Sequence, residues 1–309
     1  MFDQKRFSAF IHKYQEVTDL ASLYFPKSKR TGFEQFLKTL IENENNQNPS
    51  RLSQIISLPY YLADLFKNIS KSFYRPDNNF SSLLQEIYGF YGKNACVVNF
   101  NYDLIFEKTI REIDVTKNTD EYIRSGIKVI KIHGACNWIY PGLVAEERFG
   151  HAQKYFSQYA KDWINYFSNN NDIRVEDSPN WSYTKNNNAE SHFVYMPALA
   201  LPVNKNTHVC PESHIQVLKS VLPIINKILI IGWRAQDPRL IELLAEGLPT
   251  VNKIPTCIIT KDEDKDNTLE KRVRKVYESV PQINIVNINS HGFTEALSEG
   301  VIENFLAGN

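Results

Sequence analysis

The chain has 309 residues, of which 35 are basic and 35 acidic, so its formal net charge at pH 7 is zero. This balance excludes the basic excess that dedicated binders of nucleic acids or anionic membranes carry, and we expect no direct nucleic-acid binding. Hydrophobic residues make up 42% of the chain and charged residues 23%, which is typical of a globular protein with a sizeable core.

The sequence contains no apolar run near the roughly 18 residues that span a bilayer, and its first residues have no signal-peptide hydrophobic stretch. We therefore expect a cytoplasmic protein without membrane contact. The four cysteines are far apart and form no C-x-x-C pair, which predicts neither a disulfide framework nor a zinc ribbon.

Residues 1–92 are predicted to form a helical region that packs on the core, because apolar residues recur there at i, i+3, i+4 spacing. Thr31 and Glu34 form a T-x-x-E capping box at the start of one helix. Pro59 lies inside another periodic segment and predicts a kink or a break. The other expected boundaries are an Asn-rich helix end at 43–48 and helices over 52–69 and 83–91.

From Ala95 onward, short β-branched runs alternate with helical patterns. This pattern predicts an α/β fold over residues 93–309, with a Rossmann-like parallel sheet and helices on both faces. Residues 141–192, rich in aromatic residues and then in Asn, are expected to be a helical insertion with a loop. The predicted strands are 95–100, 127–132, 193–201, 227–232, 256–260 and 283–288.

In open α/β sheets, ligands bind at the carboxyl ends of the strands. The first such end here carries Asn101 and Asp103, just before a helix that is expected to start near Asp103. These two side chains are candidates for contacting a ligand. The alternative is an ordinary turn followed by a helix cap, for which Asn and Asp are common residues.

The second strand end carries His133 directly before Gly134, which permits a tight backbone turn. A histidine at this place can act as a general base near neutral pH. Its alternative is a structural, hydrogen-bonded histidine.

The third strand end carries Gly232, which allows close approach of the backbone to a ligand. Asp237 and Pro238 match the N-cap and the first position of the next helix. The same residues also suit ordinary α/β architecture.

Taken together, the three strand ends resemble the sirtuin-like superfamily, in particular its bacterial antiphage-defence branch of NAD-consuming effectors. The matching elements are Asn101-Tyr102-Asp103, His133-Gly134 with Trp138, and Gly232-Trp233 with Asp237-Pro238. The resemblance covers about residues 93–295 without the 141–192 insertion.

The resemblance implies that NAD is the substrate and that the bond between nicotinamide and ribose is cleaved, with water as the acceptor. Asn101 would hold the ribose or the attacking water, His133 would be the general base, and Asp103 would orient the site electrostatically. Gly232 and Trp233 would line the ribose pocket. Thr260, after the next strand, is the candidate for the adenosine half.

Two departures from the family pattern bear on this expectation. Sirtuin-like proteins open with a strand and a G-A-G-x-S type loop that holds the NAD pyrophosphate, and no such loop precedes residue 90. Either the chain begins downstream of that element or the nucleotide site is remodelled. The four-cysteine zinc ribbon of the protein deacylases is also missing, so deacetylation is not expected.

Motifs of other nucleotide and metal enzymes are absent from the sequence. There is neither a G-x-G-x-x-G turn for hydride transfer nor a G-x-x-x-x-G-K-[ST] loop for phosphate transfer. No metal site is expected, since a His- and Cys-containing cluster has no standard zinc spacing and the acidic run at 262–266 is interpreted as a solvated turn. This cluster comprises His192, His208, Cys210, Glu212 and His214.

A second, non-enzymatic function stays open: a sirtuin-like scaffold that lost catalysis with its Gly-rich loop and assembles with a DNA-translocase ATPase. In either case the resemblance implies a homo-oligomer or a separate trigger, such as a HerA-type hexameric ATPase or an Argonaute-like protein. The aromatic insertion and the N-terminal helices offer surface for such contacts.

Overall fold

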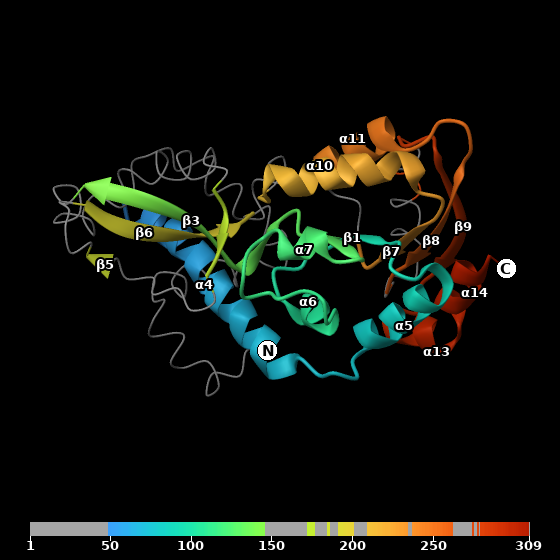
Figure 1. Ribbon diagram of the computed structural model, residues 1–309, viewed down its shortest axis with the longest axis horizontal. Coiled ribbons are helices and arrows are strands. Elements are labelled where there is room, and N and C mark those ends of the chain that lie inside the picture. Colours follow the sequence, from blue (N-terminus) through green and yellow to red (C-terminus); the bar gives the residue numbers. More distant parts are fainter. Residues whose placement is uncertain are drawn as a thin grey trace.

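The computed structural model in Figure 1 describes residues 49–145, 172–176, 184–185, 191–200, 209–233, 237–261, 274, 277 and 279–308. The predicted capping box at Thr31 and Glu34, the helix end at 43–48 and most of the 141–192 insertion lie outside these ranges. No helix in the described ranges has the length and apolar character needed to cross a membrane.

Helices and strands alternate along the described chain (Figure 1). The helices are α4 (Pro49–Phe73), α5 (Asn79–Tyr91), α6 (Ile105–Thr109), α7 (Glu121–Arg124), α10 (Glu212–Val221), the 3₁₀ turn η1 (Leu222–Ile224), α11 (Pro238–Gly247), α13 (Phe293–Ser298) and α14 (Val301–Ala307). The strands are β1 (Cys96–Val98), β2 (Lys128–Ile130), β3 (Gly134–Ala145), β4 (Arg174–Val175), β5 (Thr184–Lys185), β6 (Ser191–Leu199), β7 (Ile228–Ile231), β8 (Ile254–Ile259) and β9 (Ile283–Asn289).

The described strands include two parallel sets. Strands β1 and β2 pair in parallel, and β7, β8 and β9 form a parallel three-stranded sheet in that order. The chain is therefore a mixed α/β protein with parallel strands, as the alternation of sequence patterns predicted. The strands are short, and five of the six predicted runs overlap these parallel strands.

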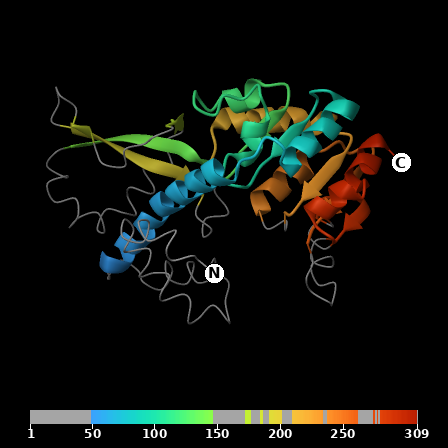
Figure 2. The same cartoon turned by 90° about the horizontal axis from the view of Figure 1, so that it is seen from below.

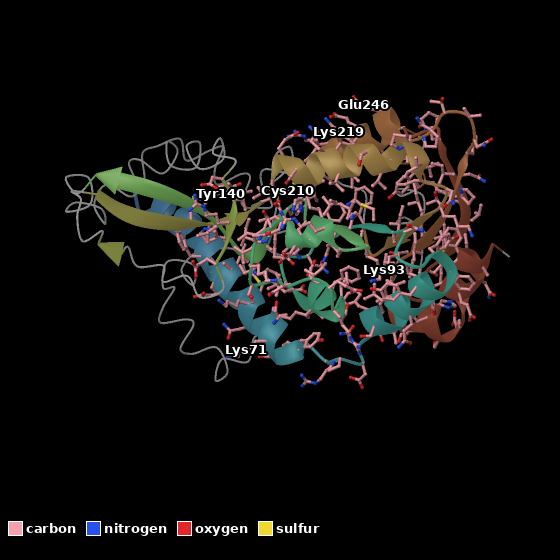
Figure 3. All side chains as sticks on the ribbon, in the orientation of Figure 1. Lys71, Lys93, Tyr140, Cys210, Lys219 and Glu246 are labelled. Carbon is pink, nitrogen blue, oxygen red and sulfur yellow. The ribbon has the colours of Figure 1, made fainter. Side chains whose placement is uncertain are left out.

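Helices cover both faces of β8, because its residues alternate between two hydrophobic clusters. Ile254 and Ile258 pack in a cluster with Leu218 of α10 and Leu240 of α11. Cys257 and Ile259 face the other way, into a cluster that contains residues of α5, α13 and α14. Helices α10 and α11 cover the face of β8 that carries Ile254 and Ile258. Figure 3 shows their outer side, where Lys219 of α10 and Glu246 of α11 point to solvent. This two-sided burial explains the continuous apolar runs in the sequence.

The predicted strand at 193–201 was wrongly assigned to the parallel sheet. It corresponds to β6, which pairs antiparallel with β3 in a separate four-stranded sheet of order β4-β3-β6-β5. The described residues of the 141–192 insertion include no helix and instead contain the end of β3, the short strands β4 and β5, and the start of β6. Long antiparallel strands can be apolar on successive residues where helices pack on them, so periodicity alone did not separate the two cases.

Helix α4 is continuous from Pro49 to Phe73 and contains Pro59 in its interior, so the predicted break does not occur. The helix packs against β3 and β6, and it lies beside this antiparallel pair in both orientations (Figures 1 and 2). Pro59 is buried in this packing. Tertiary contacts of the helix therefore outweigh the loss of one main-chain hydrogen bond at the proline.

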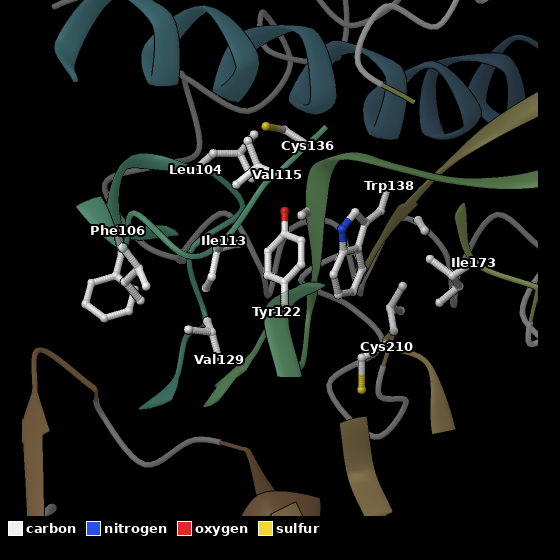
Figure 4. Packing of buried hydrophobic residues seen from close by; sticks show 14 of the residues in the cluster. Leu104, Phe106, Ile113, Val115, Tyr122, Val129, Cys136, Trp138, Ile173 and Cys210 are labelled. Carbon is white, nitrogen blue, oxygen red and sulfur yellow. The ribbon is translucent and has the colours of Figure 1, made fainter. Parts of the chain in front are cut away.

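The largest cluster of buried residues lies between α4, α6, α7 and the start of β3 (Figure 4). Tyr122 and Trp138 are fully buried at its centre, with their rings 5.3 Å apart in an edge-to-face arrangement. His214 packs edge-to-face on Trp138, and its ring also contacts that of Tyr122 at 6.3 Å between centroids. Trp138 was one of the residues on which the family resemblance was based. Because it is fully buried in this cluster, its role in the described structure is core packing.

Candidate functional site

Three strand ends that are distant in sequence meet at one place in the structure. His133 follows β2, and its Nε2 atom lies 2.9 Å from the carboxylate Oδ2 of Asp237, which follows β7. Phe100 follows β1, and its ring stacks on that of Trp233 with the centroids 5.0 Å apart. The carboxyl ends of β1, β2 and β7 therefore form one edge, as expected for a site in an α/β sheet.

The backbone around His133 is fixed from both sides. Its carbonyl oxygen accepts a hydrogen bond from the amide of Ala200, just after β6, at 2.9 Å. The next residue, Gly134, has a φ of 83°, and a Cβ atom there would lie 1.9 Å from the carbonyl oxygen of Ala198. Only glycine fits this close approach, so the His-Gly sequence is required by the β2–β3 turn and its contact with β6.

Asp237 uses its two carboxylate oxygens for two tasks. Oδ1 accepts a hydrogen bond from the amide of Leu240 at 2.9 Å and thereby caps α11, with Pro238 in the first turn. Oδ2 faces His133. The side chain of Asp237 is only 2% exposed and that of His133 is 16% exposed. The predicted N-cap is confirmed, and the same buried carboxylate also holds the imidazole.

Aromatic rings surround this pair on one side. Phe100 contacts His133 edge-to-face with the centroids 5.1 Å apart, and it stacks on Trp233. Tyr277 also contacts Trp233, edge-to-face at 6.1 Å between centroids. Trp233 is half-buried, and its ring stacks on that of Phe100, which in turn contacts His133.

Asn101 and Asp103 lie on the loop between β1 and α6. The side chain of Asn101 is exposed, and its main-chain amide donates to the side-chain oxygen of Asn99 at 3.0 Å. The carboxylate Oδ1 of Asp103 accepts from the amide of Ile105 at 3.0 Å. The helix therefore begins two residues later than predicted, and Asp103 stabilises the turn that leads into it.

Gly232 and Thr260 directly follow the neighbouring strands β7 and β8. Gly232 is exposed with a φ of 66°, and a Cβ atom there would have no neighbour within 4 Å. Its amide donates to the carbonyl oxygen of Ile259 at 2.8 Å. Thr260 is half-buried, and its amide donates to the carbonyl oxygen of Asn289 at 2.9 Å. Both residues thus lie at the same edge of the β7-β8-β9 sheet.

The His133–Asp237 pair is suited to proton transfer. The Oδ1 atom of Asp237 accepts from an amide, and an ionised carboxylate would accept the Nε2–H of His133 at Oδ2. That tautomer would leave Nδ1 as the acceptor nitrogen of the ring. A buried carboxylate that orients an imidazole in this way is the arrangement that makes histidine an effective general base.

Metal ligands do not gather in the described part of the chain, where no group of three or more His, Cys, Asp or Glu side chains has the geometry to hold an ion. The described members of the His192–His214 sequence cluster lie in different surroundings. Cys210 is buried, Glu212 is exposed at the start of α10, and His214 is fully buried with Nε2 bonded to the carbonyl oxygen of Thr119 at 2.9 Å.

Comparisons of the chain with protein-family models, curated proteins and solved structures found no match.

Sequence reasoning missed the contact of Asp237 with His133 and a buried ion pair next to the site. Asp237 was read only as a helix cap, because one contact with a backbone amide accounts for an Asp before Pro. Lys131 and Glu107 were not considered, although a lysine inside the apolar run around 127–132 is itself a signal for a buried charged pair. Both are fully buried and form an ion pair at 3.1 Å.

Proposed function

We propose that this chain is a sirtuin-like NAD hydrolase that acts as an antiphage defence effector and cleaves NAD to nicotinamide and ADP-ribose. The proposal includes a Rossmann-like arrangement of the parallel strands. The observation that carries it is the 2.9 Å contact between His133 and Asp237, which joins two of the three strand ends on which the resemblance was based. Such a pair supplies the oriented general base that hydrolysis of a glycosidic bond needs.

In the proposed reaction, the bond between the nicotinamide nitrogen and ribose C1′ breaks, and its electron pair leaves with nicotinamide. A water molecule adds to the oxocarbenium-like carbon from the opposite face. The proton of that water passes to Nδ1 of His133 and then to solvent, while Asp237 stabilises the imidazolium through Nε2. The exposed amide of Asn101 would hold the water or the ribose. Asp103, whose carboxylate lies at the start of the turn into α6, would act electrostatically.

The other residues of the site would shape the pocket. Gly232, which has open space where a Cβ would be, would allow the ribose to approach the backbone. Trp233 would form the apolar wall that keeps bulk water from the cation-like carbon. Thr260, at the end of β8, would contact the adenosine half. No metal ion takes part in this scheme.

The resemblance also leads us to propose that the protein works as a homo-oligomer with a HerA-type ATPase or another trigger protein. Light scattering of the full chain, alone and mixed with such an ATPase, tests this part. A monomer that forms no complex with the ATPase would contradict it.

The test of the hydrolase proposal is NAD consumption by the purified full-length protein, with and without the ATPase. We expect nicotinamide and ADP-ribose in equal amounts, and loss of both products in His133→Ala. Lys219→Ala, on the exposed face of α10, is the matched control and should behave as the wild type. No NAD loss under either condition, together with no NAD binding, would favour the scaffold function instead.

A further inference from the structure

A buried network of polar side chains connects the loop that carries Asn101 to the segment that carries His133. Lys131, two residues before His133, donates from Nζ to the main-chain carbonyl of Asp103 at 2.7 Å and to Oε1 of Glu107 at 3.1 Å. Both side chains of this ion pair are 0% exposed. The pair thus crosses from the end of β2 to helix α6 inside the core.

The carboxylate of Glu107 extends the network toward Asn101. Its Oε1 atom also accepts from the side-chain amide of Asn99 at 2.7 Å, and the side-chain oxygen of Asn99 accepts from the amide of Asn101 at 3.0 Å. The amide of Asn99 is itself bound to the carbonyl oxygen of Ile130, at 2.8 Å. The backbone is therefore held on both sides of Asn101, through Asn99 before it and through the Asp103 carbonyl after it.

The composition of this network argues against a purely stabilising role. Removing a lysine and a glutamate from water carries a large desolvation cost, and apolar side chains of similar volume often hold a core equally well or better. In addition, Oε2 of Glu107 is buried without a hydrogen-bond partner among the described residues. What apolar side chains cannot provide is a set of directed hydrogen bonds that fix one loop relative to a neighbouring strand end.

We infer that Lys131 and Glu107 are positioning residues that set the place of Asn101 relative to His133. This inference rests on the proposed function for its catalytic consequence, since both residues act through others and neither reaches the exposed site. The anchoring itself concerns only residues 99–107 and 131, and it can be tested without any activity.

The test compares three variants of the full-length protein. Lys131→Met with Glu107→Leu removes the network at similar volume, Lys131→Met with Glu107→Gln keeps an acceptor for Asn99, and Asn99→Ala cuts the link to Asn101 without touching the pair. We expect kcat for NAD cleavage to fall about a hundredfold in the Met/Leu variant, with little change in KM, because a displacement of about 1 Å costs that much. The Met/Gln variant should recover part of this loss, and Asn99→Ala should lose kcat while remaining folded.

Amide hydrogen exchange of residues 99–104 provides the readout that does not depend on activity. We expect faster exchange there in the Met/Leu and Asn99→Ala variants, and wild-type exchange in β8 and α11. If the wild type cleaves NAD and these variants keep its kcat, the positioning role is overturned. If the wild type does not cleave NAD, the proposed function fails, and unchanged exchange at 99–104 would overturn the anchoring as well.

Discussion

The Nε2 atom of His133 lies 2.9 Å from Oδ2 of Asp237, although 104 residues separate the two in the chain. The contact exists because β2 and β7 end at the same edge and because the Asp237 carboxylate is held in place as the cap of α11. Asp237 therefore has two roles: it caps α11, as Asp commonly does at helix starts, and it orients His133, the histidine on which the resemblance was based.

Asp237→Asn should keep the cap on α11 but remove the negative charge that holds the imidazole and stabilises its protonated form. We expect kcat for NAD cleavage to fall at least about a hundredfold, the range of general-base contributions. The free energy of unfolding should change by less than about 1 kcal/mol, because Asn is as good an N-cap as Asp. Asp237→Ser, which also caps, is the matched control for folding. Full activity in Asp237→Asn would contradict the role of the pair.

Two glycines with positive φ should respond very differently to alanine. Gly134→Ala places a Cβ atom 1.9 Å from a main-chain oxygen of β6, and the backbone must move to relieve the overlap. We expect a loss of at least about 3 kcal/mol in the free energy of unfolding, at the upper end of overpacking and backbone strain. Gly232→Ala meets no atom within 4 Å and should lose only about 1–2 kcal/mol, the cost of the left-handed conformation. Urea unfolding of both variants measures the two losses in free energy of unfolding. Equal losses would contradict the close approach of Gly134 in β3 to the carbonyl oxygen of Ala198 in β6.

The stability of the protein should fall with acid in a window set by His214. Burial lowers the pKa of this histidine from 6.5 to about 4, against the opposing effect of its bond to the Thr119 carbonyl. The unfolded chain then binds a proton that the folded chain excludes between about pH 6.5 and 4, so stability is present above that window and is lost as the pH falls through it. The loss from this group is about 3 kcal/mol, with no further loss below about pH 4.

His214→Gln should flatten this part of the pH profile. The measurement is the free energy of unfolding by urea at a series of pH values for wild type and variant. Parallel profiles from pH 6.5 to 4 would show that His214 does not titrate in this way.

The cysteine thiols should resist alkylation in the folded protein. Burial raises the pKa of Cys136 and of Cys210 to about 12, and that of Cys257 to about 11, so the reactive thiolate is scarce at pH 8. Mass spectrometry after treatment with iodoacetamide should find these residues unmodified in native protein and modified after unfolding in urea. Rapid modification of Cys136 under native conditions would contradict its place in the core.

Some of this architecture could be predicted from the sequence because the signals are local. The apolar runs at β7, β8 and β9 are bounded by Gly, Pro or polar residues, and Asp237-Pro238 is a strong local marker of a helix start. The strand at 193–201 was wrongly assigned to the parallel sheet, because an apolar run contains no information on which strand it pairs with. That pairing depends on Gly134, whose missing Cβ lets β6 return against β3.

The candidate site was predicted in part for the same reason. The places of His133, Asn101 and Gly232 after their strands are local properties of the chain. The contact of His133 with Asp237, and that of Lys131 with Glu107, join distant segments and depend on how the layers pack. No sequence spacing encodes them. They became visible only once the strand ends were placed side by side.

The most direct test of the central claim is a time course of nicotinamide and ADP-ribose formation by the full-length protein with its candidate ATPase, in wild type, His133→Ala and Asp237→Asn. The account predicts matched formation of both products in the wild type, none in His133→Ala and strongly slowed formation in Asp237→Asn. Equal NAD cleavage by wild type and His133→Ala, or none by the wild type in any condition, would contradict it.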